Sequence, residues 1–299
     1  MTERKEVKEA GEAKEVKEKD ARVAAFFDLD GTLMPRPSME KRLFWMLRYR
    51  RLIGSRNYLF WLAEALRLAR RGIIQMMHAN KMYLRGVRVN EACSVTDMRV
   101  RLRAKNEAGK NGERRGQAGM TDPPFYAEAI ERVAWHAECG HMIVMVSGTL
   151  EPLAERAARV LEAELGARGW MGKVRVCATR LEEKHERWTG RIVGEAMFGE
   201  AKARAVRRIA AEADLDLERC FAYGDSASDW WMLEAVGRPA AVNPSKDLMQ
   251  IASRNGWPVL RWDDNRISTQ SSQSLQRKQN PKATRQEAQV VSAKSGYWT

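Results

Sequence analysis

The residues best suited to chemistry are two carboxylates, Asp28 and Asp30, which come directly after the apolar run 24–27. Two positions apart at the end of an extended strand, they point the same way, and Gly31 after them supplies a turn in which backbone N–H groups can approach an anion. Two such close charges are costly without a cation between them, so the pair predicts a hard metal ion such as Mg²⁺. One carboxylate could then attack phosphorus while the other moves the proton.

Further polar groups come after apolar runs downstream. The run 143–146 leads into Ser147 and Gly148, and the run 221–223 leads into a loop that carries Asp225 and Asp229. Because these groups all stand at the ends of strand-like segments, we expect them to meet at one edge of a sheet.

A basic residue completes the set. Lys202 falls just after Gly199, near the start of a helix-like segment, where a helix N-terminus would favour an anion. As a point charge it could neutralise both the nucleophile and a phosphate. Arg204, on the same base-rich segment, is the alternative for this role.

In this order, the Asp-x-Asp-Gly-Thr segment 28–32, Ser147, Lys202 and the paired-Asp loop 225–229 resemble the four motifs of the haloacid dehalogenase superfamily of phosphotransferases and hydrolases. The resemblance covers about residues 22–262, and the helical insertion between the first two motifs is similar to that of subfamily IB, which contains phosphoserine phosphatase. By position, the resemblance implies an aspartyl-phosphate on the nucleophile Asp28, acid–base catalysis by Asp30 and a catalytic Lys202, with phosphate ligands Thr32, Ser147, Gly148 and Lys202 and Mg²⁺ ligands Asp28, Asp30, Asp225 and Asp229.

Two positions depart from the phosphoserine phosphatase pattern. Pro37 stands where those enzymes carry a Glu that meets the substrate amino group, and the nearest acid is Glu40. Ser228 stands before Asp229 where Asn is common. Both departures count against phosphoserine as substrate, but they leave the phosphate chemistry unchanged.

The order of elements predicts the fold. Strand-like and helix-like runs alternate, which predicts an α/β, Rossmann-like parallel sheet with helices on both faces. The strand-like runs are 23–29, 141–147, 174–179, 219–223 and 239–242, and the helix-like runs are 125–138, 151–166, 200–213, 228–236 and 246–254.

Composition divides the chain further. We expect a disordered arm over 1–21, a catalytic core over 22–37 and 120–263, an inserted helical cap over 38–119 with a flexible loop at 104–119, and a polar tail over 264–299. The four Cys are too widely spaced to indicate a disulfide framework, and no secretory leader or transmembrane run of about eighteen apolar residues is recognisable. These features favour a cytoplasmic protein.

The predicted cap carries most of the chain's net charge of +13. Residues 35–90 contain thirteen Lys or Arg and only two Asp or Glu, with aromatic residues between them. The aromatic residues could form a core beneath solvated Arg side chains, or the helices could contact anionic lipid, with peripheral membrane location. Nucleic-acid binding is permitted by the basic charge, but no recognised motif supports it.

We therefore expect a Mg²⁺-dependent phosphomonoester hydrolase that acts on a small phosphorylated metabolite. The first alternative is a phosphatase or phosphotransferase that acts on a lipid-linked phosphate at an anionic membrane surface. A dehalogenase would need neither Asp30 nor a metal, and a binding protein without activity would use the basic cap alone.

Overall fold

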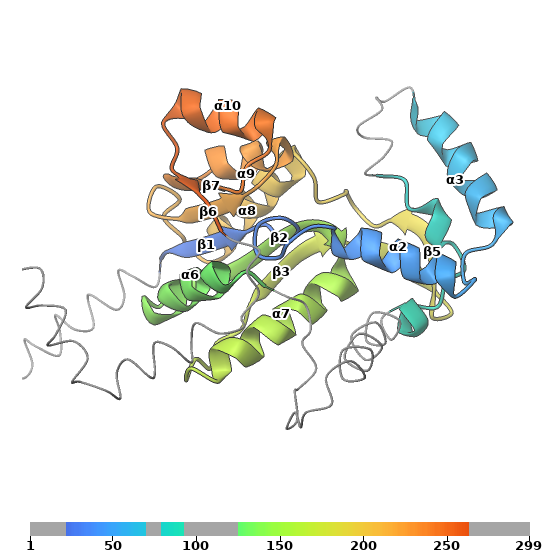
Figure 1. The fold of residues 1–299 in the computed structure, drawn as a ribbon, viewed down its shortest axis with the longest axis horizontal. Coiled ribbons are helices and arrows are strands. Elements are labelled where there is room, and N and C mark those ends of the chain that lie inside the picture. Colours follow the sequence, from blue (N-terminus) through green and yellow to red (C-terminus); the bar gives the residue numbers. More distant parts are fainter. Residues whose placement is uncertain (1–21, 70–78, 93–124, 263–299) are drawn as a thin grey trace, which may run out of the picture. The chain divides into compact units, whose positions relative to one another are not determined.

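The computed structural model describes residues 22–69, 79–92 and 125–262. Their largest sheet has six parallel strands in the order β3-β2-β1-β6-β7-β8 (Figure 1). The strands are β1 (Ala24–Phe27), β2 (Met142–Leu150), β3 (Arg175–Thr179), β6 (Phe221–Gly224), β7 (Arg238–Val242) and β8 (Val259–Leu260). The prediction of an α/β, Rossmann-like parallel sheet is confirmed.

Helices cover both faces of this sheet (Figure 1). Helices α6 (Ala127–Glu138) and α7 (Glu151–Gly166) pack with Ala25 and Phe27 of β1 in one apolar cluster. Helices α8 (Glu200–Glu212), α9 (Trp230–Glu234) and α10 (Lys246–Asn255) pack with Ala24 and Phe26 in a second. Because alternate residues of a strand face opposite sides, a strand buried on both faces must be apolar throughout, as β1 is.

The strand register brings three of the predicted motifs to one edge. Strand β1 lies between β2 and β6, and Phe27 is level with Met145 on one side and Tyr223 on the other. The N–H of Asp28 continues the pairing by donating to the carbonyl of Tyr223 (2.9 Å). Asp28, Ser147 and Asp225 therefore lie at or just beyond the carboxyl ends of neighbouring strands, where ligands bind in open α/β sheets.

The described part of the predicted cap includes the α-helices α2 (Met39–Tyr49) and α3 (Ser55–Leu68), the 3₁₀ turn η2 (Met82–Leu84) and helical residues at 89–92. Helix α2 begins after Ser38, whose hydroxyl accepts a hydrogen bond from Lys41 N–H (3.3 Å). Its buried Leu43 and Leu47 share an apolar cluster with Leu29 of the segment after β1. The start of the cap is therefore packed directly against the segment that carries Asp30.

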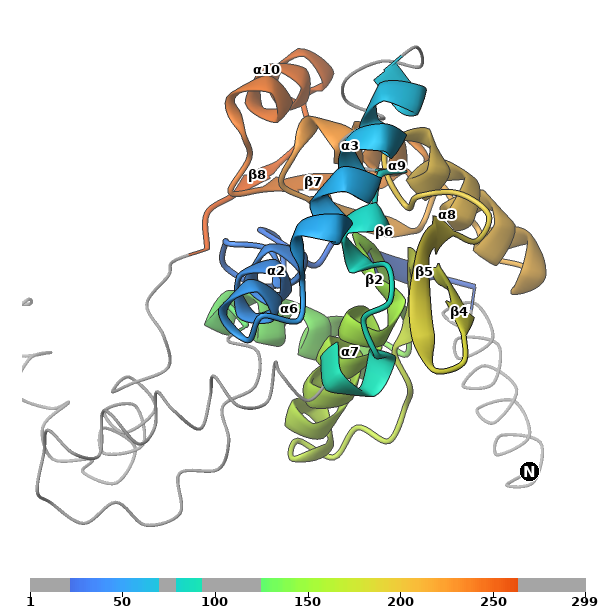
Figure 2. The ribbon, with the colours of Figure 1, turned by 90° about the vertical axis from the view of Figure 1, so that its right-hand side faces the viewer.

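A β-hairpin that the sequence did not predict lies against the cap (Figure 2). Strands β4 (Leu181–Lys184) and β5 (Arg187–Ile192) pair antiparallel in a separate two-stranded sheet. Trp188 of β5 exchanges backbone hydrogen bonds with the segment after η2, through Gly86 N–H (2.8 Å) and the carbonyl of Val87 (3.0 Å). The segment between the second and third motifs thus contributes to the packing of the cap.

Several expectations concern residues outside the described ranges. These are the arm at 1–21, the loop at 104–119 and the tail at 264–299. Among the described residues, no helix is long and apolar enough to cross a membrane.

Candidate active site

The centre of the site is the ammonium group of Lys202, which lies in the first turn of α8. Its Nζ donates to Asp28 Oδ1 and to Asp229 Oδ1, each at 2.6 Å, and all three side chains are buried. Burial alone would lower the pKa of Lys202, but the charges of Asp229 and Asp28 raise it above its ordinary value. Lys202 is therefore a fixed cation that touches the predicted nucleophile.

Arg204, the alternative to Lys202, lies elsewhere. It is exposed on the same helix, and its guanidinium binds Glu195 (2.5 Å) and Glu200 (3.0 Å). Residues two positions apart on a helix point to different sides of it, so of these two bases it is Lys202 that reaches the carboxyl edge of the sheet.

Asp229 connects Lys202 to the loop after β6. Its Oδ2 accepts hydrogen bonds from the N–H groups of Asp225 (3.2 Å) and Ser226 (2.9 Å) and from the Ser226 hydroxyl (2.8 Å). Burial favours the neutral acid, but Lys202 and these donors outweigh it and lower the pKa of Asp229. Asp229 is thus an anion that positions both the lysine and the loop.

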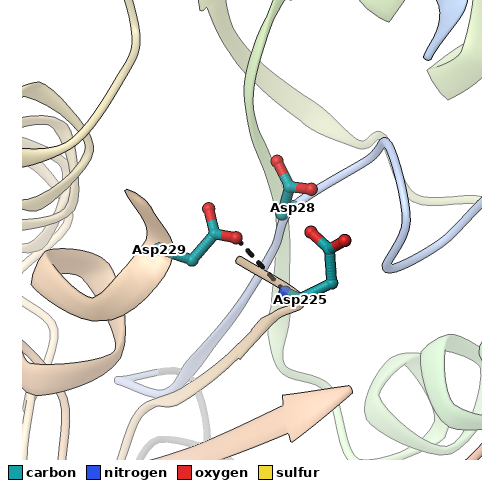
Figure 3. Close-up of side chains that lie close together, drawn as sticks. All are labelled: Asp28, Asp225 and Asp229. Carbon is teal, nitrogen blue, oxygen red and sulfur yellow. Dashed lines mark hydrogen bonds between the residues drawn. The ribbon is translucent and has the colours of Figure 1, made fainter. Parts of the chain in front are cut away.

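Three buried carboxylates, Asp28, Asp225 and Asp229, converge at this edge of the sheet (Figure 3). Each offers an oxygen within 4.8 Å of the others. Burial and the neighbouring carboxylates raise the pKa of Asp28 well above its usual value although Lys202 opposes this, and burial and Asp229 raise the pKa of Asp225 to about 6. Three buried carboxylates this close together, two of them with raised pKa values, fit a hard divalent cation, which would favour their charged forms.

The side chain of Asp30 lies apart from these three carboxylates. Its Oδ1 accepts a hydrogen bond from the N–H of Met39 at the start of α2 (2.8 Å). Burial raises the pKa of Asp30 to about 6, with a further contribution from the charge of Glu40, while the Met39 N–H opposes the rise. A carboxyl group whose pKa is close to neutral pH can both donate and accept a proton.

The other predicted phosphate ligands lie near the same strand ends, with Thr32 and Ser147 buried and Gly148 half-buried. The Thr32 hydroxyl is buried and has no hydrogen-bond partner among the described residues. Ser147 Oγ accepts from the N–H of Thr149 (3.2 Å), and the carbonyl of Gly148 accepts from the Thr179 hydroxyl (2.8 Å). A buried hydroxyl without a partner is costly, so Thr32 is well suited to an incoming phosphate oxygen.

Arg36 also contacts the site, although the sequence did not single it out. Its Nη2 (2.5 Å) and Nε (3.2 Å) both donate to Oδ2 of Asp225. Gly31 makes room for this contact, because a Cβ there would lie 2.1 Å from the same oxygen. The only signal in the sequence is that a base stands eight residues after the predicted nucleophile, and such a position has no fixed meaning without the fold.

Comparisons with known proteins agree with this geometry. A family model described as haloacid dehalogenase-like hydrolase matches residues 25–234. A probable phosphatase of Mycobacterium tuberculosis is 32% identical over 245 residues, which are 80% of this chain and 75% of the relative. Phosphoserine phosphatase SerB1 of the same species is 29% identical over 250 residues, which are 80% of this chain and 71% of SerB1.

A solved structure supports the fold. A protein of unknown function from Bordetella pertussis Tohama I matches with a TM-score of 0.53 and 26% identity, over 80% of this chain and 98% of that one. The resemblance drawn from the four motifs is confirmed by the family match, which spans all four of them. The chain belongs to the haloacid dehalogenase-like hydrolase family.

Proposed function

We propose that the chain is a Mg²⁺-dependent phosphomonoesterase that acts on a small phosphorylated metabolite through an aspartyl-phosphate. The observation that carries the proposal is the contact of Lys202 Nζ with Asp28 Oδ1 (2.6 Å) beside two further buried carboxylates. Similarity to two mycobacterial proteins named as phosphatases supports the choice of phosphorus as the reacting atom.

In this mechanism, Asp28 attacks the phosphorus atom and the bond to the leaving oxygen breaks. Asp30 gives its proton to that oxygen, and the raised pKa of Asp30, about 6, keeps a fraction of the carboxyl protonated for this step. A water molecule then gives a proton to Asp30 and attacks the phosphorus, which releases inorganic phosphate and restores Asp28.

The remaining groups would bind the phosphate and neutralise its charge. Lys202, the hydroxyls of Thr32 and Ser147, and Gly148 next to Ser147 would bind phosphoryl oxygens. A divalent cation, held by Asp28 and Asp225 with the backbone carbonyl of Asp30 and with Asp229 nearby, would neutralise the phosphate. Lys202 holds Asp28 in place before and after the reaction.

Glu40 has a different role from the substrate-binding Glu of phosphoserine phosphatases. Its carboxylate accepts hydrogen bonds from Lys81 Nζ (2.6 and 2.7 Å) and from the Tyr83 hydroxyl (2.5 Å). Because Lys81 already neutralises it, Glu40 is a poor partner for a substrate amino group. We therefore propose a substrate other than phosphoserine.

A panel of phosphomonoesters, assayed with Mg²⁺ and with excess chelator, tests this function. Asp28→Asn keeps the shape of the side chain but removes the nucleophile, so turnover should fall below about 1% of wild type on every substrate. Asp214→Asn, an exposed change, is the matched control and should leave turnover unchanged. Full activity in chelator, or substantial activity of Asp28→Asn, would contradict the proposal, and transfer to an added alcohol would identify a phosphotransferase.

A second candidate function, action on a lipid-linked phosphate, is favoured by one surface of the cap. Leu59, Leu62 and Leu66 recur at helical spacing on α3 and are 65%, 51% and 69% exposed. Residues 35–69 carry eight Lys or Arg and two Asp or Glu. An apolar stripe on a basic segment of the chain suits an anionic lipid surface, whereas exposed leucines would add nothing to the binding of nucleic acid.

Co-sedimentation with vesicles tests this candidate. Wild type should pellet with vesicles of acidic phospholipid at low salt and be released near 1 M salt, where the Debye length is about 3 Å. Serine at Leu59, Leu62 and Leu66 together should abolish the pellet, while Val193→Ser, an exposed apolar position outside α3, should not. Equal, negligible pellets with acidic and neutral vesicles would reject the lipid interpretation.

A further inference from the structure

The contact between Arg36 and Asp225 joins an exposed cation to a buried anion. The Arg36 side chain is 65% exposed, whereas that of Asp225 is 5% exposed. Both donor nitrogens of Arg36 bind the same oxygen of Asp225. The contact therefore covers a buried carboxylate from the outside of the site.

The charges of the site explain why a second cation is present. Lys202 Nζ donates to Asp28 and to Asp229, so its two short contacts are made with carboxylates other than Asp225. Arg36 supplies a positive charge in direct contact with Asp225. Burial and Asp229 favour the neutral form of Asp225, and Arg36 opposes them.

A divalent cation and this guanidinium compete for the same carboxylate. The proposed metal site includes Asp225, so an ion bound there would lie close to the Arg36 guanidinium and would repel it with twice the charge of a monovalent ion. An ion pair with a largely exposed partner is weak because solvent screens it. The divalent ion should therefore displace the Arg36 guanidinium from Asp225.

We propose that Arg36 is a displaceable counter-cation of the metal site, which holds Asp225 while the metal is absent and leaves it when a divalent cation binds. This inference rests on the proposed function, because it assumes that Asp225 is a metal ligand. It adds that the metal-free protein has its own arrangement of charges, in which Arg36 supplies part of the positive charge that the metal ion would bring.

The backbone around Arg36 can stay in place while the side chain moves. The N–H of Met39 is fixed to Asp30 (2.8 Å). The guanidinium of Arg42 binds the carbonyls of Pro35 and Pro37, each at 2.8 Å. With the main chain held on both sides of Arg36, its release needs only side-chain rotation and leaves α2 where it is.

Titration calorimetry of Mg²⁺ into the chelator-treated, full-length protein tests the proposal. Arg36→Ala should bind Mg²⁺ about threefold or more tightly than wild type, which matches the strength of an exposed ion pair. Arg36→Lys, which keeps the charge, should stay nearer wild type. Arg48→Ala, which removes an exposed charge from the same region, is the matched control and should change the affinity less than about twofold.

Thermal unfolding gives a second readout that does not depend on activity. Arg36→Ala should lower the unfolding temperature of the metal-free protein but not of the Mg²⁺-saturated protein. Weaker or unchanged Mg²⁺ binding by Arg36→Ala would overturn the proposal, since it would make Arg36 a permanent support of Asp225. If wild type itself bound no Mg²⁺, the metal site of the proposed function would be wrong, and the Arg36 proposal would fall with it.

Discussion

At the scale of single residues, one buried lysine neutralises two of the carboxylates of the site. Lys202 is buried between Asp28 and Asp229 at 2.6 Å from each. Burial penalises an ion strongly, and only the two close charges keep this lysine protonated. The same contact that would prepare Asp28 for attack on phosphorus therefore also contributes to folding.

Replacement of this lysine should affect both stability and turnover. Lys202→Met leaves two buried carboxylates without their cation, so we expect the free energy of unfolding to fall by about 3 kcal/mol and hydrolysis to be lost. Arg204→Met, on the same helix but exposed, should change the stability by less than about 0.5 kcal/mol and spare hydrolysis. Urea unfolding and a phosphate-release assay measure the two effects, and similar behaviour of both variants would contradict the role of Lys202.

Removal of the Thr32 hydroxyl should affect phosphate binding and protein stability differently. Thr32→Val removes a buried hydroxyl that has no partner among the described residues, so the fold should be as stable as before or slightly more stable. Inorganic phosphate should nevertheless inhibit the variant about tenfold more weakly, because a hydrogen bond to an anion is lost. Thr149→Val, which also removes a buried hydroxyl that has no partner in the described part of the chain, is the control and should leave inhibition unchanged. Unaltered inhibition of Thr32→Val would remove Thr32 from the phosphate site.

At the scale of elements, the β4–β5 hairpin connects the cap to the chain between the second and third motifs. Gly190 of β5 has a φ of +84°. A Cβ at this position would lie 2.9 Å from the Cα of Met82 in η2, so the hairpin and the cap touch through backbone atoms. Only glycine allows both this conformation and this approach.

A pair of glycine variants measures the strength of this contact. Gly194→Ala should cost about 1 kcal/mol, because its φ is +75° but a Cβ there would meet no atom within 4 Å. Gly190→Ala should cost clearly more, since it adds a clash with the Met82 backbone to a similar strain. Urea unfolding measures the loss of stability in each variant. Equal losses would show that the hairpin moves to accommodate the added methyl group at no cost in free energy.

The elements also show what the sequence could and could not predict. Strands β1, β2 and β6 are apolar runs that lead into Asp or Ser, and both the fold and the positions of the motifs could be predicted from them. The hairpin was missed because Leu181–Lys184 is short and mostly polar, and because Trp188 of its second strand bonds to Gly86 and Val87, which lie far away in the sequence. The same holds for Arg36, whose contact with Asp225 spans 189 positions. A helical cap was predicted, but which apolar residues of its helix α3 would be exposed depends on tertiary packing alone.

At the scale of the whole molecule, a buried histidine links α6 to the sheet. His136 is fully buried, with its Nδ1 2.8 Å from Nδ1 of His141 and its Nε2 2.9 Å from the Tyr223 hydroxyl. Burial, and then the charges of His141 and Arg132, lower the pKa of His136 to about 3. The folded protein therefore keeps this ring neutral at pH values where an unfolded chain would protonate it.

Stability should depend on pH through this histidine. Its pKa rises from about 3 in the folded state to about 6.5 in the unfolded state, so the unfolded chain binds more protons at this group in that interval, and the histidine lowers the free energy of unfolding as the pH falls. Near pH 5 the loss should reach about 2 kcal/mol. The raised pKa values of Asp30 and Asp225 act in the opposite direction, but they do so equally in wild type and in His136→Phe. His136→Phe, which is the less stable protein, should therefore come closer to wild type by about 2 kcal/mol between pH 7 and pH 5, whereas His185→Asn, an exposed change, should behave as wild type does. Parallel curves for His136→Phe and wild type would exclude His136 as the source.

The contact between Asp28 and Lys202 joins residues that are 174 positions apart in the chain. During synthesis, Asp28 is therefore made long before the lysine that neutralises it, and the loop with Asp225 and Asp229 is made later still. A nascent chain cannot assemble the proposed active site until the segment that carries Asp229 has left the ribosome and folded, because the long loop between these residues must close before their contacts can form. Truncated products of interrupted translation are therefore expected to lack the proposed phosphatase activity.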